Sequence, residues 1–254
     1  LNYLLKEKIF SHCSMLALSI FVSGSFTFGS LIANEISPEL LTLYRFLLAT
    51  IILGVILQFK KSIRSHHLKN IWRYFVLGAI YSIYFVFMFV ALKYTTTVST
   101  AAIFTLLPLF AALLERLFLK KSSPVLIWAA LILSGMGALW IIFEGSINGL
   151  FQFRFEEGEA IFLVGTICYA SYAIIQPKLF EGENIYVTTL GVLAAGSIIL
   201  AISLILQQSS FIVHKITFEV FWVIFYLAIF ASIGSITCLN YASPRLSALS
   251  LIHI

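Results

Sequence analysis

The sequence is poor in charge and has no aspartate at all. Of its 254 residues, 11% are charged and 61% are hydrophobic. A soluble globular domain has about 25% charged residues, because its large exposed surface needs polar side chains. The composition therefore excludes a water-soluble fold, and such apolar content also excludes a disordered chain.

Cysteine pairs and catalytic motifs are missing as well. The three cysteines, Cys13, Cys168 and Cys238, lie far apart inside apolar runs, which excludes a disulfide scaffold. Intramembrane hydrolases need paired Asp residues, Ser with His, or a His-Glu-x-x-His motif, and no apolar run carries one of these. No zinc spacing, phosphate loop or nucleotide fingerprint is present either. We therefore predict that the protein is not an enzyme and uses no metal or cofactor.

Long apolar stretches take the place of these features. A helix needs about 20 residues to cross the hydrocarbon core, and eight stretches qualify. They are continuously apolar and not alternating, which argues against an outer-membrane barrel. A ninth run, Leu246–Ile254, has nine residues, about half of a crossing. We predict an all-α integral membrane protein with eight full spans and the start of a ninth. The predicted spans are Ser11–Leu31, Pro38–Phe59, Ile71–Leu92, Ser99–Leu119, Pro124–Phe143, Glu159–Gln176, Tyr186–Leu206 and Phe218–Leu239.

Lys and Arg are distributed unevenly over the connections between these spans. The N-terminus and alternate connections hold twelve of them and the other side holds three, with Arg45 inside a span left out. Cytoplasmic loops carry the excess of basic residues, so we predict a cytoplasmic N-terminus in the inner (plasma) membrane. The net charge of +5 then indicates anchoring at anionic lipid, and there is no separate basic domain to bind nucleic acid.

A weak internal repeat has an offset of 147 residues, which places the first span on the sixth and the third on the eighth. Five helices per repeat is an odd number, so the second copy starts on the opposite side of the membrane. Inverted repeats suit alternating access, with the binding site between the halves. We predict one repeat in residues 1–147 and a second in 148–254. The matching pairs are Leu92 and Leu239, Tyr94 and Tyr241, and Ala101 and Ala248.

Five motifs follow one another along the chain. They are Ser37-Pro38 with Leu43-Tyr44-Arg45-Phe46-Leu47-Leu48-Ala49, Ala91-Leu92-Lys93-Tyr94-Thr95-Thr96-Thr97, Ala101-Ala102-Ile103-Phe104-Thr105-Leu106-Leu107-Pro108, Ser134-Gly135-Met136-Gly137, and Leu239-Asn240-Tyr241-Ala242-Ser243. Their order and spacing resemble the EamA type of the drug/metabolite transporter (DMT) superfamily. The resemblance implies ten helices in two five-helix repeats, with both termini cytoplasmic.

The sequence departs from this family pattern at two places. Lys121 stands where the family usually has a glutamate. The proline that matches Pro108 would be residue 255, so we expect the last two helices of the family fold to be absent.

Arg45 is the one strong charge well inside a predicted span, about two turns from Pro38. A charge at that depth is costly and usually faces the bundle interior. Arg45 is interpreted either as a binding group for a substrate carboxylate or phosphate, or as a structural charge. In the structural interpretation it pairs with Glu35 or Glu39, or extends outward to the interface.

Several tyrosines are candidates for a substrate pathway. Tyr169, Tyr172 and Gln176 lie on one face of the sixth span at i, i+3 and i+7. A polar stripe in a membrane helix should face protein or water; the alternative is ordinary aromatic packing. Pro108 removes one backbone hydrogen bond and is expected to kink its helix. The predicted pathway residues are Arg45, Tyr81, Tyr84, Tyr169, Tyr172 and Gln176, with Tyr226 a further candidate, and the predicted gating or structural residues are Pro38, Pro108, Gly135 and Gly137.

The first span, Ser11–Leu31, contains no acidic residue. Related small multidrug pumps use a carboxylate there, so its absence favours a neutral, zwitterionic or aromatic metabolite over a cation. We predict a secondary transporter, an exporter or permease, for a small amino-acid-like or aromatic metabolite. The alternative is a transport-inactive truncated fragment or a non-catalytic membrane assembly partner. The expected partners are membrane lipid, a small-molecule substrate and a second copy in a homodimer, with no nucleic acid.

Overall fold

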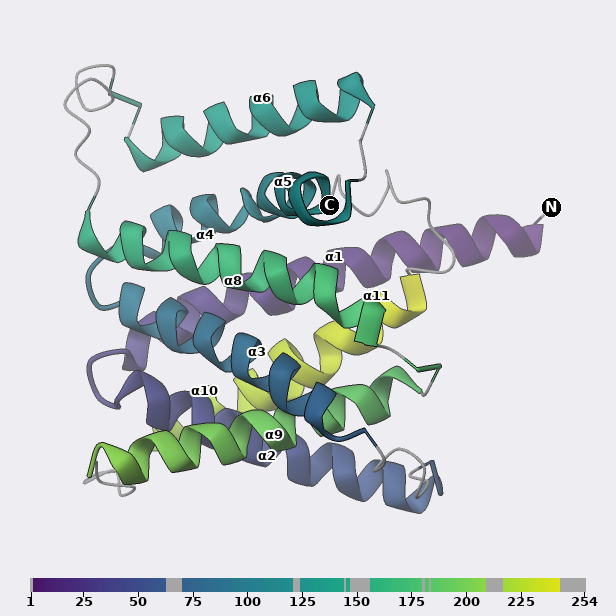
Figure 1. The fold of residues 1–254 in the computed structure, drawn as a ribbon, viewed down its shortest axis with the longest axis vertical. Helices are drawn as coiled ribbons and strands as arrows, with labels where there is room; N and C mark the ends of the chain where they lie inside the picture. Colours follow the sequence, from purple (N-terminus) through teal and green to yellow (C-terminus); the bar gives the residue numbers. More distant parts are fainter. Residues whose placement is uncertain are drawn as a thin grey trace.

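The computed structural model describes residues 2–62, 70–120, 124–143, 145–146, 156–179, 181–182, 184–208 and 217–242. Every regular element in these ranges is a helix (Figure 1), and eight helical segments are long and apolar enough to cross a membrane. The prediction of an all-α integral membrane protein is therefore confirmed. The elements are α1 (Asn2–Ile32), α2 (Pro38–Phe59), α3 (Trp72–Ala91), α4 (Thr97–Phe104), α5 (Leu107–Leu119), α6 (Val125–Ile142), α8 (Glu157–Leu179), α9 (Ile185–Leu206), α10 (Phe218–Ala228), the π-helix η2 (Ile229–Gly234) and α11 (Ser235–Ala242).

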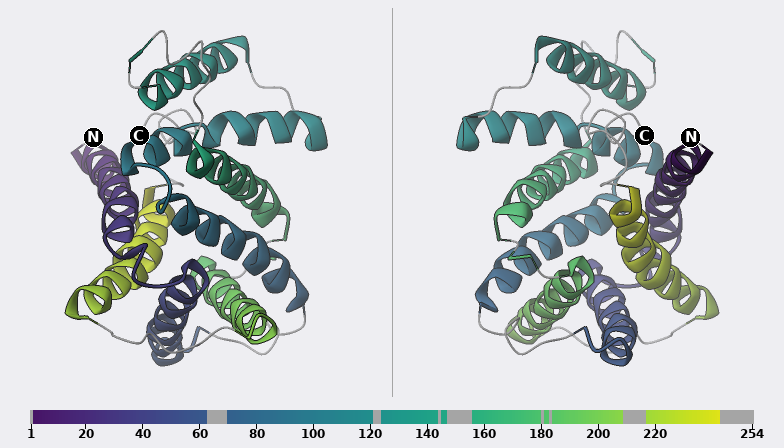
Figure 2. Two further views of the ribbon diagram at one scale, coloured as in Figure 1. Left: turned by 90° about the vertical axis from the view of Figure 1, so that its left-hand side faces the viewer. Right: turned by 90° about the vertical axis from the view of Figure 1, so that its right-hand side faces the viewer.

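Helices from distant parts of the chain form the core of the bundle. The helix α3 packs against α8 and α9, α2 packs against α9, and α1 packs against α11 (Figures 1 and 2). At the crossing of α3 and α9, Gly78 lies directly against the backbone of Gly196. Small residues allow such close approach between membrane helices. The helix α6 lies at the edge of the bundle, where it packs on α4 and α5.

The predicted fourth span is broken into two helices. The span was predicted from Ser99 to Leu119 with a kink at Pro108, and in the structure α4 ends at Phe104 and α5 begins at Leu107. Pro108 has no N–H to donate to the carbonyl of Phe104, so the α-helical ladder cannot continue there. Thr105 donates its hydroxyl to the carbonyl of Ala102 at 2.6 Å, which supports the last turn of α4. The expected kink at Pro108 is present, one turn ahead of the proline ring.

The predicted eighth span contains a π-helical turn, η2, between α10 and α11. It was expected to be one regular helix from Phe218 to Leu239. Two serine hydroxyls support the wider turn: Ser232 donates to the carbonyl of Leu227 at 2.9 Å, and Ser235 donates to that of Phe230 at 3.3 Å. Single π-helical turns within α-helices are frequent at functional sites.

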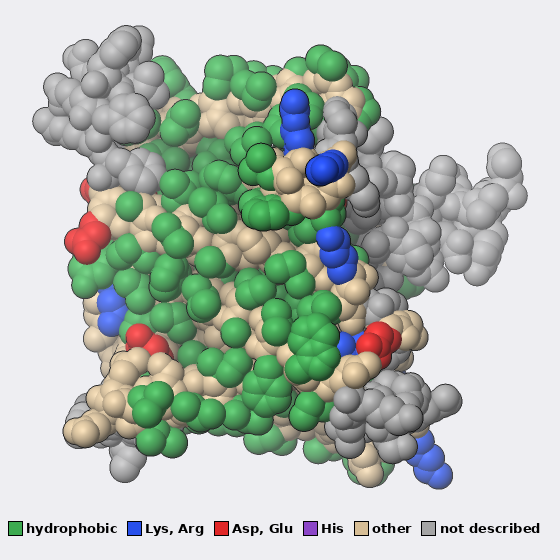
Figure 3. All heavy atoms as spheres, in the orientation of Figure 1, with side chains coloured by type: hydrophobic (Ala, Val, Ile, Leu, Met, Phe, Trp, Pro, Cys, Tyr) green, Lys and Arg blue, Asp and Glu red, His purple; other side chains and the backbone are tan. Residues whose placement is uncertain are grey.

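Hydrophobic side chains cover the sides of the bundle (Figure 3), as expected for a surface that faces lipid. On this face, Lys and Arg gather mainly at the end of the bundle where α1 begins. The boundary predicted between the repeats, the ninth apolar run and Lys121 lie outside the described residues.

Candidate functional site

The start of α2 determines where Arg45 lies. Ser37 caps the helix, since its hydroxyl accepts a hydrogen bond from the Leu40 N–H at 3.3 Å. Pro38, predicted to be structural, occupies the first turn, where a missing N–H costs nothing. Glu39 in the same turn is favourable at the positive end of the helix dipole. Arg45 follows about two turns later and is only 1% exposed.

The Arg45 guanidinium is held by the eighth span and not by an acid. Its Nε donates to the Ser232 hydroxyl at 2.9 Å and its Nη2 donates to the Ala231 carbonyl at 3.2 Å. Its Cζ lies 3.9 Å from the centre of the Phe85 ring, a cation–π contact. No ion pair joins it to a carboxylate of the described residues, so pairing with Glu35 or Glu39 is wrong. The alternative in which Arg45 extends outward is also wrong, because the side chain is buried.

One nitrogen of this guanidinium is unused. Nη1 of Arg45 is buried and has no hydrogen-bond partner among the described residues. A guanidinium carries five N–H donors in a planar fork and stays charged in proteins. A buried donor without an acceptor is costly, which makes Nη1 the clearest candidate for contact with a bound anion.

Four of the predicted pathway tyrosines lie together beside Arg45. Tyr84 from α3 stacks on Tyr169 from α8 with ring centres 4.5 Å apart. Tyr81 lies 4.9 Å from Tyr172 and 4.8 Å from Phe85, the ring that contacts the guanidinium. Tyr81 and Tyr84 are buried, while Tyr169 and Tyr172 are partly buried. The structure therefore brings the predicted residues of the third and sixth spans into one aromatic cluster next to the unused donor.

The remaining predicted residues lie elsewhere. Gln176 is half-buried, one turn beyond Tyr172 on α8. Tyr226 is on the outside of the bundle, where its hydroxyl donates to the carbonyl of Phe21 at 3.3 Å. Gly135 packs against Leu106 and Leu109 beside the break before Pro108, while Gly137 is exposed with no neighbour within 4 Å of a Cβ position. The gating or structural roles predicted for Gly135 and Gly137, and the pathway roles predicted for Gln176 and Tyr226, stay predictions.

Two further buried charges were missed in the sequence. Arg73, counted there as a loop residue, is buried at the start of α3 and pairs with Glu181 at 3.3 Å. Glu159 is buried in the first turn of α8, where its Oε2 accepts a hydrogen bond from the Glu156 N–H at 3.0 Å. A Glu three residues after the cap is a known sequence signal for a helix start. Ser232 was missed as well, because it lies 187 positions from Arg45 in the sequence.

The described residues contain no group of three or more His, Cys, Asp or Glu side chains that could hold a metal ion. The arrangement offers instead a fixed positive charge, a guanidinium nitrogen without a hydrogen-bond partner among the described residues, and a set of flat rings. Such a site can bind an anionic group and stack an aromatic body.

Comparisons with known proteins indicate the family to which the chain belongs. The sequence pattern of the EamA-like transporter family matches residues 9–143. The "Uncharacterized transporter YyaM" of Bacillus subtilis is 28% identical over 221 residues, which cover 86% of this chain and 72% of that protein. An "Uncharacterized transporter" of Archaeoglobus fulgidus is 25% identical over 242 residues, or 93% of this chain and 81% of the relative.

A solved crystal structure also matches, with a TM-score of 0.66 and 15% sequence identity over 97% of this chain and 82% of the other. At that identity the match concerns the fold alone. The family match covers more than half of the sequence, and the relatives are named as transporters. The chain therefore belongs to the EamA-like transporter family and is a multi-pass membrane transporter.

Proposed function

We propose that the chain transports a small metabolite that carries a carboxylate and an aromatic or apolar body, as an aromatic amino acid does. The observation that carries this proposal is the buried Nη1 of Arg45, which has no partner among the described residues. A substrate carboxylate supplies the missing acceptor with a charge-assisted hydrogen bond. The tyrosine cluster beside it offers ring faces to the body of the substrate.

Alternating access is the mechanism we propose, and the pairing of helices supports it. The helix α3 packs on α8, and α1 packs on α10 and α11. Each pair joins one helix from residues 1–147 to one from 148–254. The predicted repeat matches α1 with α8 and α3 with the eighth span, so the two pairs correspond to each other. Two halves that exchange conformations expose a central site first to one side of the membrane and then to the other.

For orientation, we propose a cytoplasmic N-terminus in the inner membrane. The twelve-to-three bias of Lys and Arg supports this. The clustering of basic side chains at the end where α1 begins is consistent with it (Figure 3).

The test uses purified protein in liposomes. Uptake of labelled phenylalanine, tyrosine and tryptophan is measured beside their decarboxylated amines. We expect the amino acids to be carried and the amines to be disfavoured by about 10- to 100-fold, the range of one hydrogen bond to a charged group. Arg45→Met should remove this discrimination, because the hydrophobic replacement leaves no donor for a carboxylate.

A matched control separates binding from folding. Arg45→Lys and Arg73→Lys make the same change at two buried arginines, of which only Arg45 lies at the tyrosine cluster. We expect Arg45→Lys to raise KM for the amino acid about tenfold or more, since Lys lacks the planar fork, and Arg73→Lys to change KM less than twofold. Equal carriage of amines and amino acids, or an unchanged KM in Arg45→Lys, would show that Arg45 does not bind the carboxylate.

A further inference from the structure

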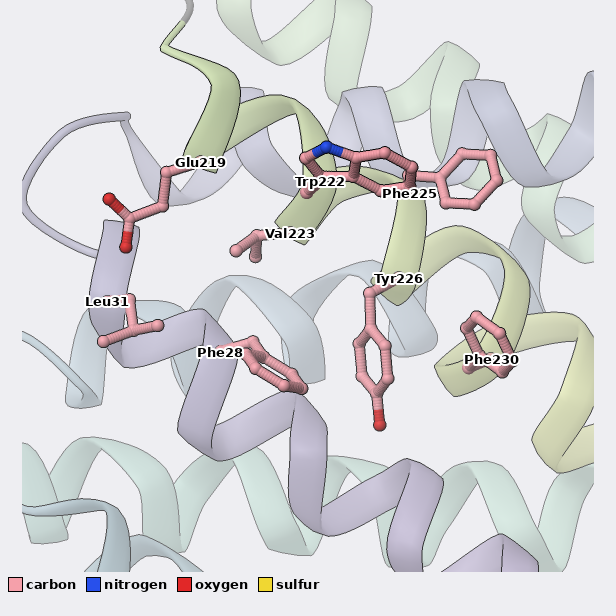
Figure 4. Close-up of a pocket in the computed structure, with 8 residues that line it drawn as sticks. All are labelled: Phe28, Leu31, Glu219, Trp222, Val223, Phe225, Tyr226 and Phe230. Atoms are coloured by element: carbon pink, nitrogen blue, oxygen red, sulfur yellow. The ribbon is translucent and has the colours of Figure 1, made fainter.

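A groove of about 370 Å³ lies between α1 and α10 (Figure 4). Its walls are aromatic and aliphatic, and it contains a single charged side chain, Glu219. Leu31 is 54% exposed and Trp222 is 47% exposed, so the groove opens on the outside of the bundle. It is separate from the Arg45 site, which lies in the buried core. The residues that matter most here are Phe28 and Leu31 from α1 and Glu219, Trp222, Tyr226 and Phe230 from the eighth span.

The length of the groove matches one leaflet of a bilayer. Glu219 is the second residue of the spanning segment Phe218–Cys238, so it stands at the membrane boundary. Phe230 lies eleven residues further along, which is a rise of about 16 Å in a helix. The hydrocarbon core is about 30 Å thick, so the aromatic wall reaches about halfway through it.

The rings form a continuous apolar wall along this depth. Phe28 meets Tyr226 edge-to-face with ring centres 4.7 Å apart, and Tyr226 stacks on Phe230 at 5.4 Å. Tyr226 also donates its hydroxyl to the carbonyl of Phe21 on α1 at 3.3 Å, which leaves little polar surface in the groove. An acyl chain fits such a wall because it makes no demand for hydrogen bonds.

The carboxylate of Glu219 stands at the membrane-boundary end of the groove. Glu219 is exposed and has no ion-pair partner among the described residues. Trp222 lies about one turn deeper on the same helix, and both side chains line the groove. A carboxylate attracts an ammonium group and an indole face adds a cation–π contact, whereas an anionic headgroup is repelled.

We propose that this groove binds one phospholipid with an ammonium headgroup, with the ammonium at Glu219 and an acyl chain along the aromatic wall. A soluble ammonium compound would use only the boundary end and leave the wall unfilled. The bound lipid touches α1 and α10, which come from the two predicted halves of the chain, so it lies across a contact between them.

Quenching of Trp222 fluorescence by brominated lipid tests the proposal. A variant with Trp72, Trp128 and Trp140 changed to Phe keeps Trp222 alone. It is placed in vesicles of equal parts phosphatidylethanolamine and phosphatidylglycerol, with bromine on the chains of one lipid and then of the other. We expect about threefold enrichment of phosphatidylethanolamine at Trp222, the size that exposed cation–π and ion-pair contacts give.

Two substitutions locate the effect. Glu219→Gln should bring the enrichment down to the bulk ratio. Glu157→Gln should leave it unchanged, because Glu157 is also an exposed carboxylate in the first turn of a span but lies outside the groove. Native mass spectrometry of the unmodified protein in the same lipid mixture provides a second measurement, in which retained phosphatidylethanolamine should exceed phosphatidylglycerol by a similar factor.

Equal quenching by the two lipids, preference for phosphatidylglycerol, or a preference that survives Glu219→Gln would overturn the proposal. Soluble phosphoethanolamine added in excess should not displace the lipid. Loss of quenching under that condition would mean that the groove takes a free solute, and the assignment of a lipid would be wrong.

Discussion

The crossing of α3 and α9 depends on a glycine, so Gly78→Ala is a sharp test of the packing. A Cβ on Gly78 would lie 2.8 Å from the Gly196 backbone nitrogen and 2.9 Å from the Val192 carbonyl oxygen. Carbon contacts are comfortable at about 3.5 Å, so the two helices must separate by about 0.6 Å. Both opposing atoms belong to the backbone of α9, so neither can rotate away as a side chain does.

The expected loss follows from two opposing effects. Overpacking a tight contact costs about 1–3 kcal/mol. Replacing a helical glycine by alanine recovers about 0.5–1 kcal/mol through backbone entropy. The middle of these ranges leaves a net loss of about 1.2 kcal/mol, and a chain of this size loses about 2–4 °C per kcal/mol. We therefore expect Gly78→Ala to lower the apparent Tm of the detergent-solubilised protein by about 2–5 °C, measured as the fraction that remains monodisperse after heating.

The matched control is Gly137→Ala. It makes the same change in the middle of α6, where a Cβ has no neighbour within 4 Å. This variant should have an unchanged or slightly higher Tm. If Gly78→Ala is as stable as the wild type, or if both variants lose stability equally, the close approach of α3 and α9 is wrong.

Three further predictions test other parts of the structure. A cysteine replacing Ser146, in a variant without the native cysteines, should react with an impermeant thiol reagent from outside intact cells. Labelling only after membrane disruption would show that the predicted orientation is wrong. Arg73→Ala should lower Tm more than Glu181→Ala. Glu181 is half exposed, whereas Arg73 is buried and also donates to the Leu179 carbonyl at 3.0 Å. Equal losses of Tm would contradict this. Gly24→Ala should lower Tm, because its Cβ displaces the Tyr226 side chain. In the double variant, Tyr226→Ala should cancel part of that loss. Additive losses would show that Gly24 and Tyr226 are not in contact.

The sequence predicted the parts of the site that depend on local spacing or on the cost of charge in lipid. Tyr169 and Tyr172 share a helix face because they are three residues apart, and the structure stacks them with rings 5° from parallel. The burial of Arg45 followed from its depth in a span. Both inferences concern one helix at a time, and the number of spans was predictable for the same reason.

What the sequence could not supply is the pairing between helices and the local departures from regular geometry. Ser232 and the Ala231 carbonyl, which bind Arg45, both lie in the π-helical turn of the eighth span. No short sequence motif predicts such a turn. Arg73 was missed because a charge at the end of a span looks like a loop residue until its partner across the bundle is known.

The π-helical turn also changes how the two halves of the chain should be compared. A π-helix accommodates an extra residue within a turn, so a span that contains one shifts register against a regular relative. The eighth span has 21 residues and the third has 20. The buried positions Tyr74, Leu77, Tyr81 and Ser82 of α3 correspond, 146 positions later, to the buried Val220, Val223, Leu227 and Ala228.

Within the turn, the correspondence changes by one position. Tyr84 and Phe85 now match Ala231 and Ser232 at 147 positions, and all four are buried. A single residue inserted into one of the two predicted repeats would produce this shift. Phe85 and Ser232, the matched pair, both contact the guanidinium of Arg45. If the predicted repeats are correct, Arg45 is thus held by an aromatic ring and a hydroxyl that occupy matching positions of the third and eighth spans.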